Sequence, residues 1–91
     1  MQYVNVTIDH QPDAGQYSRE HFAYRDFLGH TDEITAREFA FKALDEGDFR
    51  KGLIRVGFPE GPSYSFRFVR MGLMGYNLIQ TSEQAQEPQL V

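Results

Sequence analysis

The sequence predicts an α+β fold: a small antiparallel sheet of about four strands with one helix packed on one face, in the order ββαββ, and room for one further C-terminal strand. Three patterns predict it: an alternating segment near the N-terminus, a helical stripe in the middle, and two apolar runs around a Pro-Gly turn. At 91 residues the chain can bury one modest core. We expect a single domain over residues 1–80 and a flexible C-terminal tail over 81–91, which is polar and lacks periodicity.

The first two strands are expected in the N-terminal third. Residues 3–8 alternate, with Val4, Val6 and Ile8 on one face, which predicts a strand. Residues 16–28 fit either a strand or a broken helical stripe. We favour a strand over about residues 19–27 that pairs with the first, because the first strand otherwise lacks a local partner.

The predicted helix begins at a capping box. Thr35 and Glu38 form a T-x-x-E pair, in which each side chain can satisfy the other's backbone N–H, and Ile34 and Phe39 fit the accompanying hydrophobic staple. A core stripe follows at helical spacing. Its members are Ala36, Phe39, Ala40, Ala43 and Leu44.

The end of the helix is marked by Gly47, which we expect to adopt the left-handed conformation of a C-terminal cap. Phe41 lies outside the core stripe. It either flanks the core or is exposed for a partner.

A β-hairpin is predicted next, with Leu53–Phe58 and Tyr64–Arg70 as its strands. Matching the apolar residues places Phe58 opposite Tyr64 and forms one apolar face against the helix. The same register places Arg55 directly opposite Arg67 on the outer face, a mildly destabilising pair of like charges. Beyond the hairpin, two glycines suggest a bend before a further strand over residues 76–79.

Composition restricts the function. The net charge is −4, and residues 1–48 carry ten acids against four bases. Such a surface repels phosphate backbones, so general nucleic-acid binding is disfavoured, whereas a basic protein surface is a suitable partner. There is no cysteine, which excludes disulfides and thiolate chemistry. No apolar segment is long enough for a membrane span, and we expect no membrane association and a cytoplasmic location.

No catalytic or metal-binding pattern is apparent. The three histidines lack the short spacings that metal sites use, and no serine lies in a nucleophile elbow. We therefore expect a non-catalytic protein without metal or cofactor. The candidate site residues are instead charged or aromatic. The acidic candidates for partner binding are Asp32, Glu33, Asp45, Glu46 and Asp48, and the candidates for partner or anion binding are Arg55, Arg67, Arg50, Lys51 and Phe41.

A capped helix (ITAREFAFKALDEG) followed by a hairpin (GLIRVGFPEGPSYSFRFV) in a small, cysteine-free acidic chain resembles phage-encoded inhibitors of bacterial defence, notably anti-CRISPR proteins. The resemblance covers about residues 3–70 and is one of size, charge and element order. It implies a non-catalytic inhibitor in the bacterial cytoplasm that occupies the basic surface of a nucleic-acid-binding complex, with a CRISPR effector subunit as the partner.

Two other functions remain open. The chain could be a structural or assembly module that self-associates through a sheet edge. Alternatively, the hairpin arginines could bind an anion or another ligand. The sequence leaves open whether the protein is a monomer or a homodimer.

Overall fold

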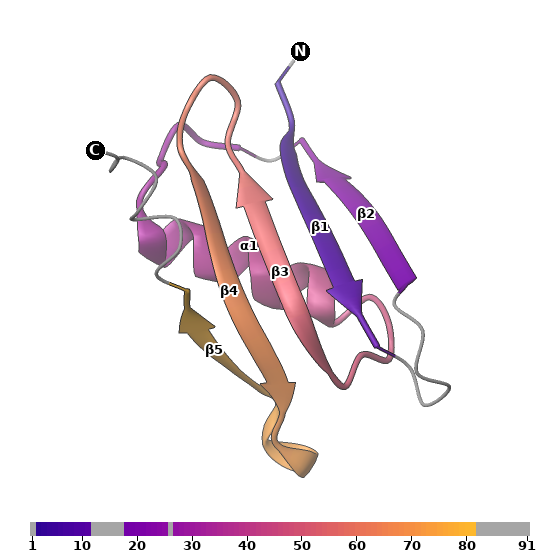
Figure 1. Ribbon diagram of the computed structural model, residues 1–91. Coiled ribbons are helices and arrows are strands. Elements are labelled where there is room, and N and C mark those ends of the chain that lie inside the picture. The colour runs from indigo at the N-terminus through magenta and orange to yellow at the C-terminus, as the bar shows by residue number, and fades with distance from the viewer. Residues whose placement is uncertain (1, 12–17, 26, 82–91) are drawn as a thin grey trace, which may run out of the picture.

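A computed structural model describes residues 2–11, 18–25 and 27–81. It has one antiparallel five-stranded sheet in the order β2-β1-β3-β4-β5, with a single α-helix, α1, across one face (Figure 1). The elements are β1 (Val4–His10), β2 (Ser18–Tyr24), α1 (Glu33–Leu44), β3 (Lys51–Gly57), β4 (Ser63–Arg70), the 3-10 helix η1 (Gly72–Met74) and β5 (Tyr76–Gln80). The predicted α+β fold is confirmed, and the additional strand is present as β5.

The core lies between α1 and the sheet. In β1 the three aliphatic residues Val4, Val6 and Ile8 are fully buried, as the alternation predicts, and Phe66 and Phe68 of β4 belong to the same buried core. The buried stripe of α1 is the predicted one, from Ala36 to Leu44. Among the described residues no polar or charged side chain is buried in this core.

The second strand is also confirmed. Residues 18–24 form β2, which pairs antiparallel with β1 so that Phe22 lies opposite Val6. Because β1 also pairs with β3, through Val6 and Val56, the first strand lies inside the sheet and β2 lies at its edge (Figure 1).

The predicted capping box is wrong. The helix begins at Glu33, and its N-cap is Asp32, whose Oδ1 accepts a hydrogen bond from the N–H of Thr35 at 2.9 Å. Aspartate is a stronger N-cap residue than threonine, and here it takes that position three residues earlier. Ile34 is therefore part of the first turn and is 69% exposed, so it does not form the expected staple with Phe39.

The predicted role of Gly47 is wrong as well. The C-cap is Asp45 in the right-handed helical conformation, and Gly47 does not have a positive φ. A β-carbon at Gly47 would lie 2.8 Å from Cε2 of Phe49. Because Phe49 is buried, a side chain at Gly47 would press against a ring that has little room to move.

The hairpin register differs from the prediction by two residues. Tyr64 pairs with Val56, not with Phe58. The cause is a tight turn: the N–H of Gly61 donates to the carbonyl of Phe58 at 3.2 Å, and Glu60 adopts a φ of 53°. Proline at the second position and a positive φ at the third are typical of a type II turn, which leaves only three residues in the loop.

In the observed register of the hairpin, the two arginines do not lie directly opposite each other. Arg55 lies opposite Ser65, and Arg67 lies opposite Leu53, so the predicted direct Arg55–Arg67 pair is absent and the two are diagonal neighbours. A shift of two residues keeps every side chain on its predicted face.

The last strand, β5, ends at Gln80, and Thr81 adds two more hydrogen bonds to β4. The N–H and hydroxyl of Thr81 both donate to the carbonyl of Ser65, at 3.0 Å and 3.3 Å. The predicted tail over 81–91 otherwise lies outside the described residues.

Candidate binding surface

Most of the acidic candidates have partners within the chain. Asp32 caps the helix, and its hydrogen bond from Thr35 lowers the pKa of its carboxyl. Oε2 of Glu33 lies 2.8 Å from Nη2 of Arg37, one helical turn away. These two acids therefore stabilise α1 and are less available to a partner.

The acids after the helix differ among themselves. Asp48 forms an ion pair with Arg70 at 2.5 Å, and Tyr76 and Asp48 together raise the pKa of that arginine. Glu46 accepts a hydrogen bond from the hydroxyl of Tyr24 at 3.4 Å. Asp45 is exposed, and no side-chain contact to it is found within the described ranges.

The basic candidates lie in two places. Lys51, Arg55 and Arg67 occupy outer positions of β3 and β4, on the face of the sheet that α1 leaves open. Arg50 precedes β3, and its carbonyl accepts a hydrogen bond from the N–H of Arg70 at 2.7 Å. The structure thus brings three of the four basic candidates to one face.

Apolar side chains on the same face are the part that the sequence prediction missed. Leu53 of β3, Val69 of β4 and Ile79 of β5 are 45%, 39% and 55% exposed. Arg67 lies opposite Leu53 on one side and opposite Ile79 on the other. A signal for these residues existed in the period-two pattern, which assigns all of them to the outer face.

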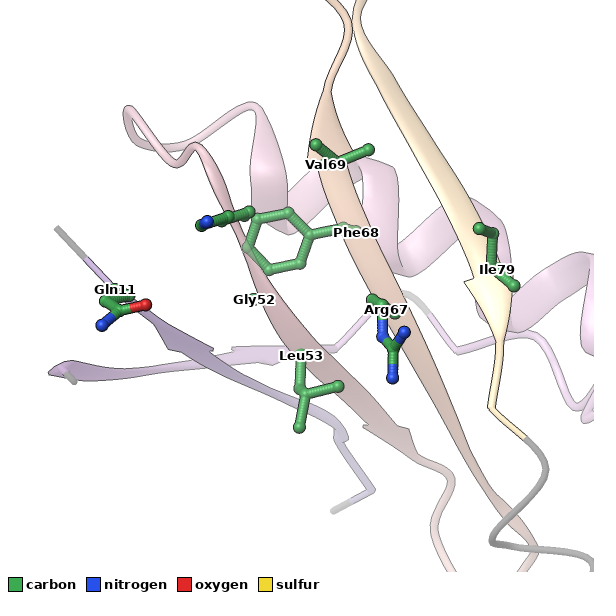
Figure 2. Close-up of a pocket in the computed structure, with 8 residues that line it drawn as sticks. Gln11, Gly52, Leu53, Arg67, Phe68, Val69 and Ile79 are labelled. Carbon is green, nitrogen blue, oxygen red and sulfur yellow. The ribbon is translucent and has the colours of Figure 1, made fainter. Parts of the chain in front are cut away.

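We call these six residues the open-face patch: Lys51, Leu53, Arg55, Arg67, Val69 and Ile79. Five of them line a shallow groove of about 500 Å³, together with Gln11, Gly52 and Phe68. Figure 2 shows Leu53, Arg67 and Ile79 on three neighbouring strands, with α1 on the other side of the sheet. The groove has the volume of a small-ligand or side-chain site.

The charged residues of the open-face patch are all positive. No acidic residue lines the groove. The nearest acid in the register is Asp9, opposite Leu53, and its carboxylate already accepts two hydrogen bonds from the guanidinium of Arg19, at 2.6 Å and 3.2 Å. In the part of the chain that the structure describes, Lys51, Arg55 and Arg67 have no carboxylate partner.

This arrangement can do two things chemically. The three cations can bind a carboxylate or another anion, and the apolar side chains around Arg67 can exclude water from such a contact. An ion pair formed in an apolar, water-poor setting is stronger than one in open solvent.

Phe41 lies on the other side of the molecule, on α1, and is 39% exposed. It shares the outer side of the helix with two exposed acids, Glu38 and Asp45. Glu38 was not among the predicted site residues, because the predicted capping box paired its carboxylate with the backbone N–H of Thr35.

Residues 2–11, 18–25 and 27–81 contain no group of three or more His, Asp or Glu residues that could hold a metal ion. Within the same ranges, no helix has the length and the apolar character that crossing a membrane requires.

No family model, curated protein or solved structure matches the chain.

Proposed function

We propose that this protein is a non-catalytic binding protein whose open-face patch holds an acidic, partly apolar segment of a protein partner. The observation that carries the proposal is the setting of Arg67, which is exposed, lies between Leu53 and Ile79, and has no carboxylate partner in the described residues. Arginines surrounded by apolar side chains contribute much of the binding energy in many protein interfaces.

Charge supports the same proposal. An exposed cation without an internal partner retains its full capacity for charge-assisted hydrogen bonds, and arginine can bind a carboxylate through two parallel N–H groups. Arg55 and Lys51 extend the positive charge along β3 on either side of Leu53. A segment with carboxylates next to apolar residues therefore matches the patch better than a purely acidic or a purely apolar one.

The test compares Arg67→Glu with Arg25→Glu. Arg25 is also exposed and lies over the ring of Tyr3, at the far end of the sheet from the groove, so it is a control for the change of charge. Each protein is immobilised and incubated with lysate of the cell that expresses it, and retained proteins are identified by mass spectrometry. We expect a stoichiometric partner on the wild type and on Arg25→Glu that is lost on Arg67→Glu. Equal retention by all three proteins would contradict the proposal.

A second candidate is inhibition of a nucleic-acid-binding bacterial defence complex, of the CRISPR effector kind, through the acidic side of the helix. Glu38 and Asp45 favour it, since both are exposed and have no side-chain partner within the described ranges. Carboxylates presented in this way can compete with phosphates for a basic surface.

This candidate is tested by the double substitution Glu38→Lys and Asp45→Lys. An inhibitor of this type would block target-DNA binding by the effector complex in a gel-shift assay, and the double variant would not. If the wild type leaves DNA binding by such complexes unchanged, the inhibitor function is wrong.

A further inference from the structure

A second exposed surface lies on α1, opposite the open face. Four residues, Ile34, Glu38, Phe41 and Asp45, recur at helical spacing along one line of α1 and its C-cap, and all are exposed. Leu28, in the segment before the helix, is 84% exposed and lines a hollow of about 260 Å³ with Glu38, His30 and Lys42. We call Leu28 and the four residues of that line the helix-face patch.

The helix-face patch combines apolar surface with negative charge. Its three apolar members, Leu28, Ile34 and Phe41, are 84%, 69% and 39% exposed. The cations of α1 contact groups of their own chain. Arg37 pairs with Glu33 and donates to the carbonyl of Leu78 at 3.0 Å, and Nζ of Lys42 lies 5.0 Å from the ring centre of Tyr24.

The two patches are therefore complementary. One presents Arg67 and its neighbouring cations among apolar residues, and the other presents Glu38 and Asp45 among apolar residues. From this complementarity we infer that the segment bound by the open-face patch is the helix-face patch of a second copy of this chain. This inference rests on the proposed function and names the partner of the same site.

Dimensions agree with such a contact. From Ile34 to Asp45 a helix rises about 16 Å, at 1.5 Å per residue. The open-face patch extends over about 13 Å along β3, from Lys51 to Arg55, and over about 10 Å from β3 to β5. Three turns of helix thus cover the patch, and the packing repeats the one that α1 already makes on the inner face of the same sheet.

The charges also decide the symmetry of the contact. Two open-face patches placed against each other would bring Arg67 and Arg55 of both copies together without a carboxylate, which is unfavourable. A contact between unlike patches avoids this. Because the patches lie on opposite layers of the molecule, each copy can bind one neighbour on each side, and the contact propagates head to tail.

The experiment uses two variants, each with one damaged patch. Arg67→Glu damages the open-face patch, and Glu38→Gln with Asp45→Asn damages the helix-face patch without adding positive charge that could pair with the carboxylate introduced by Arg67→Glu. All three residues are exposed, so we expect a wild-type circular dichroism spectrum from both variants. If the helix double variant does not fold, Ile34→Ser, at a 69% exposed side chain, replaces it.

Sedimentation velocity over a range of concentrations is the readout. We expect the wild type and Arg25→Glu to form assemblies that grow with concentration, and each patch variant alone to associate more than about tenfold more weakly. An equimolar mixture of the two patch variants should form a 1:1 complex and nothing larger, since only one contact can form. That stoichiometry separates a head-to-tail contact from one between identical surfaces.

Three outcomes would overturn the inference. They are a wild type that stays monomeric at the highest concentration, assembly that Arg67→Glu does not weaken, and a mixture that gives no 1:1 complex. The second outcome would instead indicate pairing through the edge strands β2 or β5. A monomeric wild type that still captures an Arg67-dependent partner from lysate would overturn this inference and leave the proposed function intact.

Discussion

A β-carbon on Gly52 would lie 2.1 Å from the carbonyl oxygen of Asp9. Gly52 adopts a φ of 155° at the start of β3, where it pairs with His10 of β1. A side chain at this position must therefore push apart two strands whose pairing holds the centre of the sheet.

We expect Gly52→Ala to destabilise the protein by more than the roughly 1–3 kcal/mol of backbone strain alone. Gly57, in the same strand, is the matched control. A β-carbon there would lie 3.5 Å from Ser63 Oγ and 3.9 Å from Asn5 O, which are ordinary contacts. Chemical denaturation of both variants measures the difference, and equal stabilities would show that β1 and β3 accommodate a methyl group at Gly52 without cost.

The N-cap predicts a specific pH dependence. The hydrogen bond from Thr35 lowers the pKa of Asp32 in the folded protein, so the carboxylate stabilises the fold above its unfolded pKa of about 3.9. That contribution is lost as the pH falls through the lower, folded value. We expect Asp32→Ala to lower the melting temperature by a few degrees at neutral pH.

The difference between wild type and Asp32→Ala should shrink in acid, because the wild-type carboxyl is then protonated. Thermal melts followed by circular dichroism from neutral pH down to about pH 2 test this. Asp32→Asn retains an oxygen acceptor and should lose less than the alanine variant. A difference that does not change with pH would rule out the carboxylate as the source of the stabilisation.

The hairpin turn can be improved. Glu60 has a φ of 53°, a conformation that costs a residue with a β-carbon about 1–2 kcal/mol and glycine nothing. Glu60→Gly should raise the free energy of unfolding by up to about 1 kcal/mol, since added freedom in the unfolded chain offsets part of the gain. Glu60→Ala removes the same carboxylate without relieving the backbone and serves as the control.

The open-face patch should matter for binding and little for folding. Leu53 and Ile79 are about half exposed, and both lie on the face away from the core. We expect Leu53→Thr and Ile79→Thr to change the free energy of unfolding by less than about 1 kcal/mol and to abolish retention of the partner. A large loss of stability in either variant would indicate that these side chains serve the fold.

The elements of this fold could be predicted because their signals are local. Alternation identified β1, and the stripe from Ala36 to Leu44 identified α1. The hairpin register could not be predicted from apolar matching, because registers that differ by two residues bury the same side chains. The turn decides between them, through the conformation of Glu60. The helix start was misplaced because Asp32 and Thr35 are both suitable N-cap residues and lie only three residues apart.

The site was predicted in part. Arg55, Arg67 and Lys51 were identified by charge, and the structure places all three on the open face. Leu53 and Ile79 were missed because only charged and aromatic residues were considered as candidates for the site. Only the order of the strands shows that Ile79 lies beside Arg67, since that contact joins residues of different strands.

The interior position of β1 has a consequence for how the chain folds. Its pairing with β3 joins Val6 to Val56, a contact between segments far apart along the chain, whereas β3–β4 and β4–β5 close over short loops. Contacts of long sequence separation cost more chain entropy and form late. We therefore expect the three-stranded meander β3–β4–β5 to form first. We expect β1 to pair with β3 only after the rate-limiting step, so substitutions at Val6 should accelerate unfolding more than they slow folding.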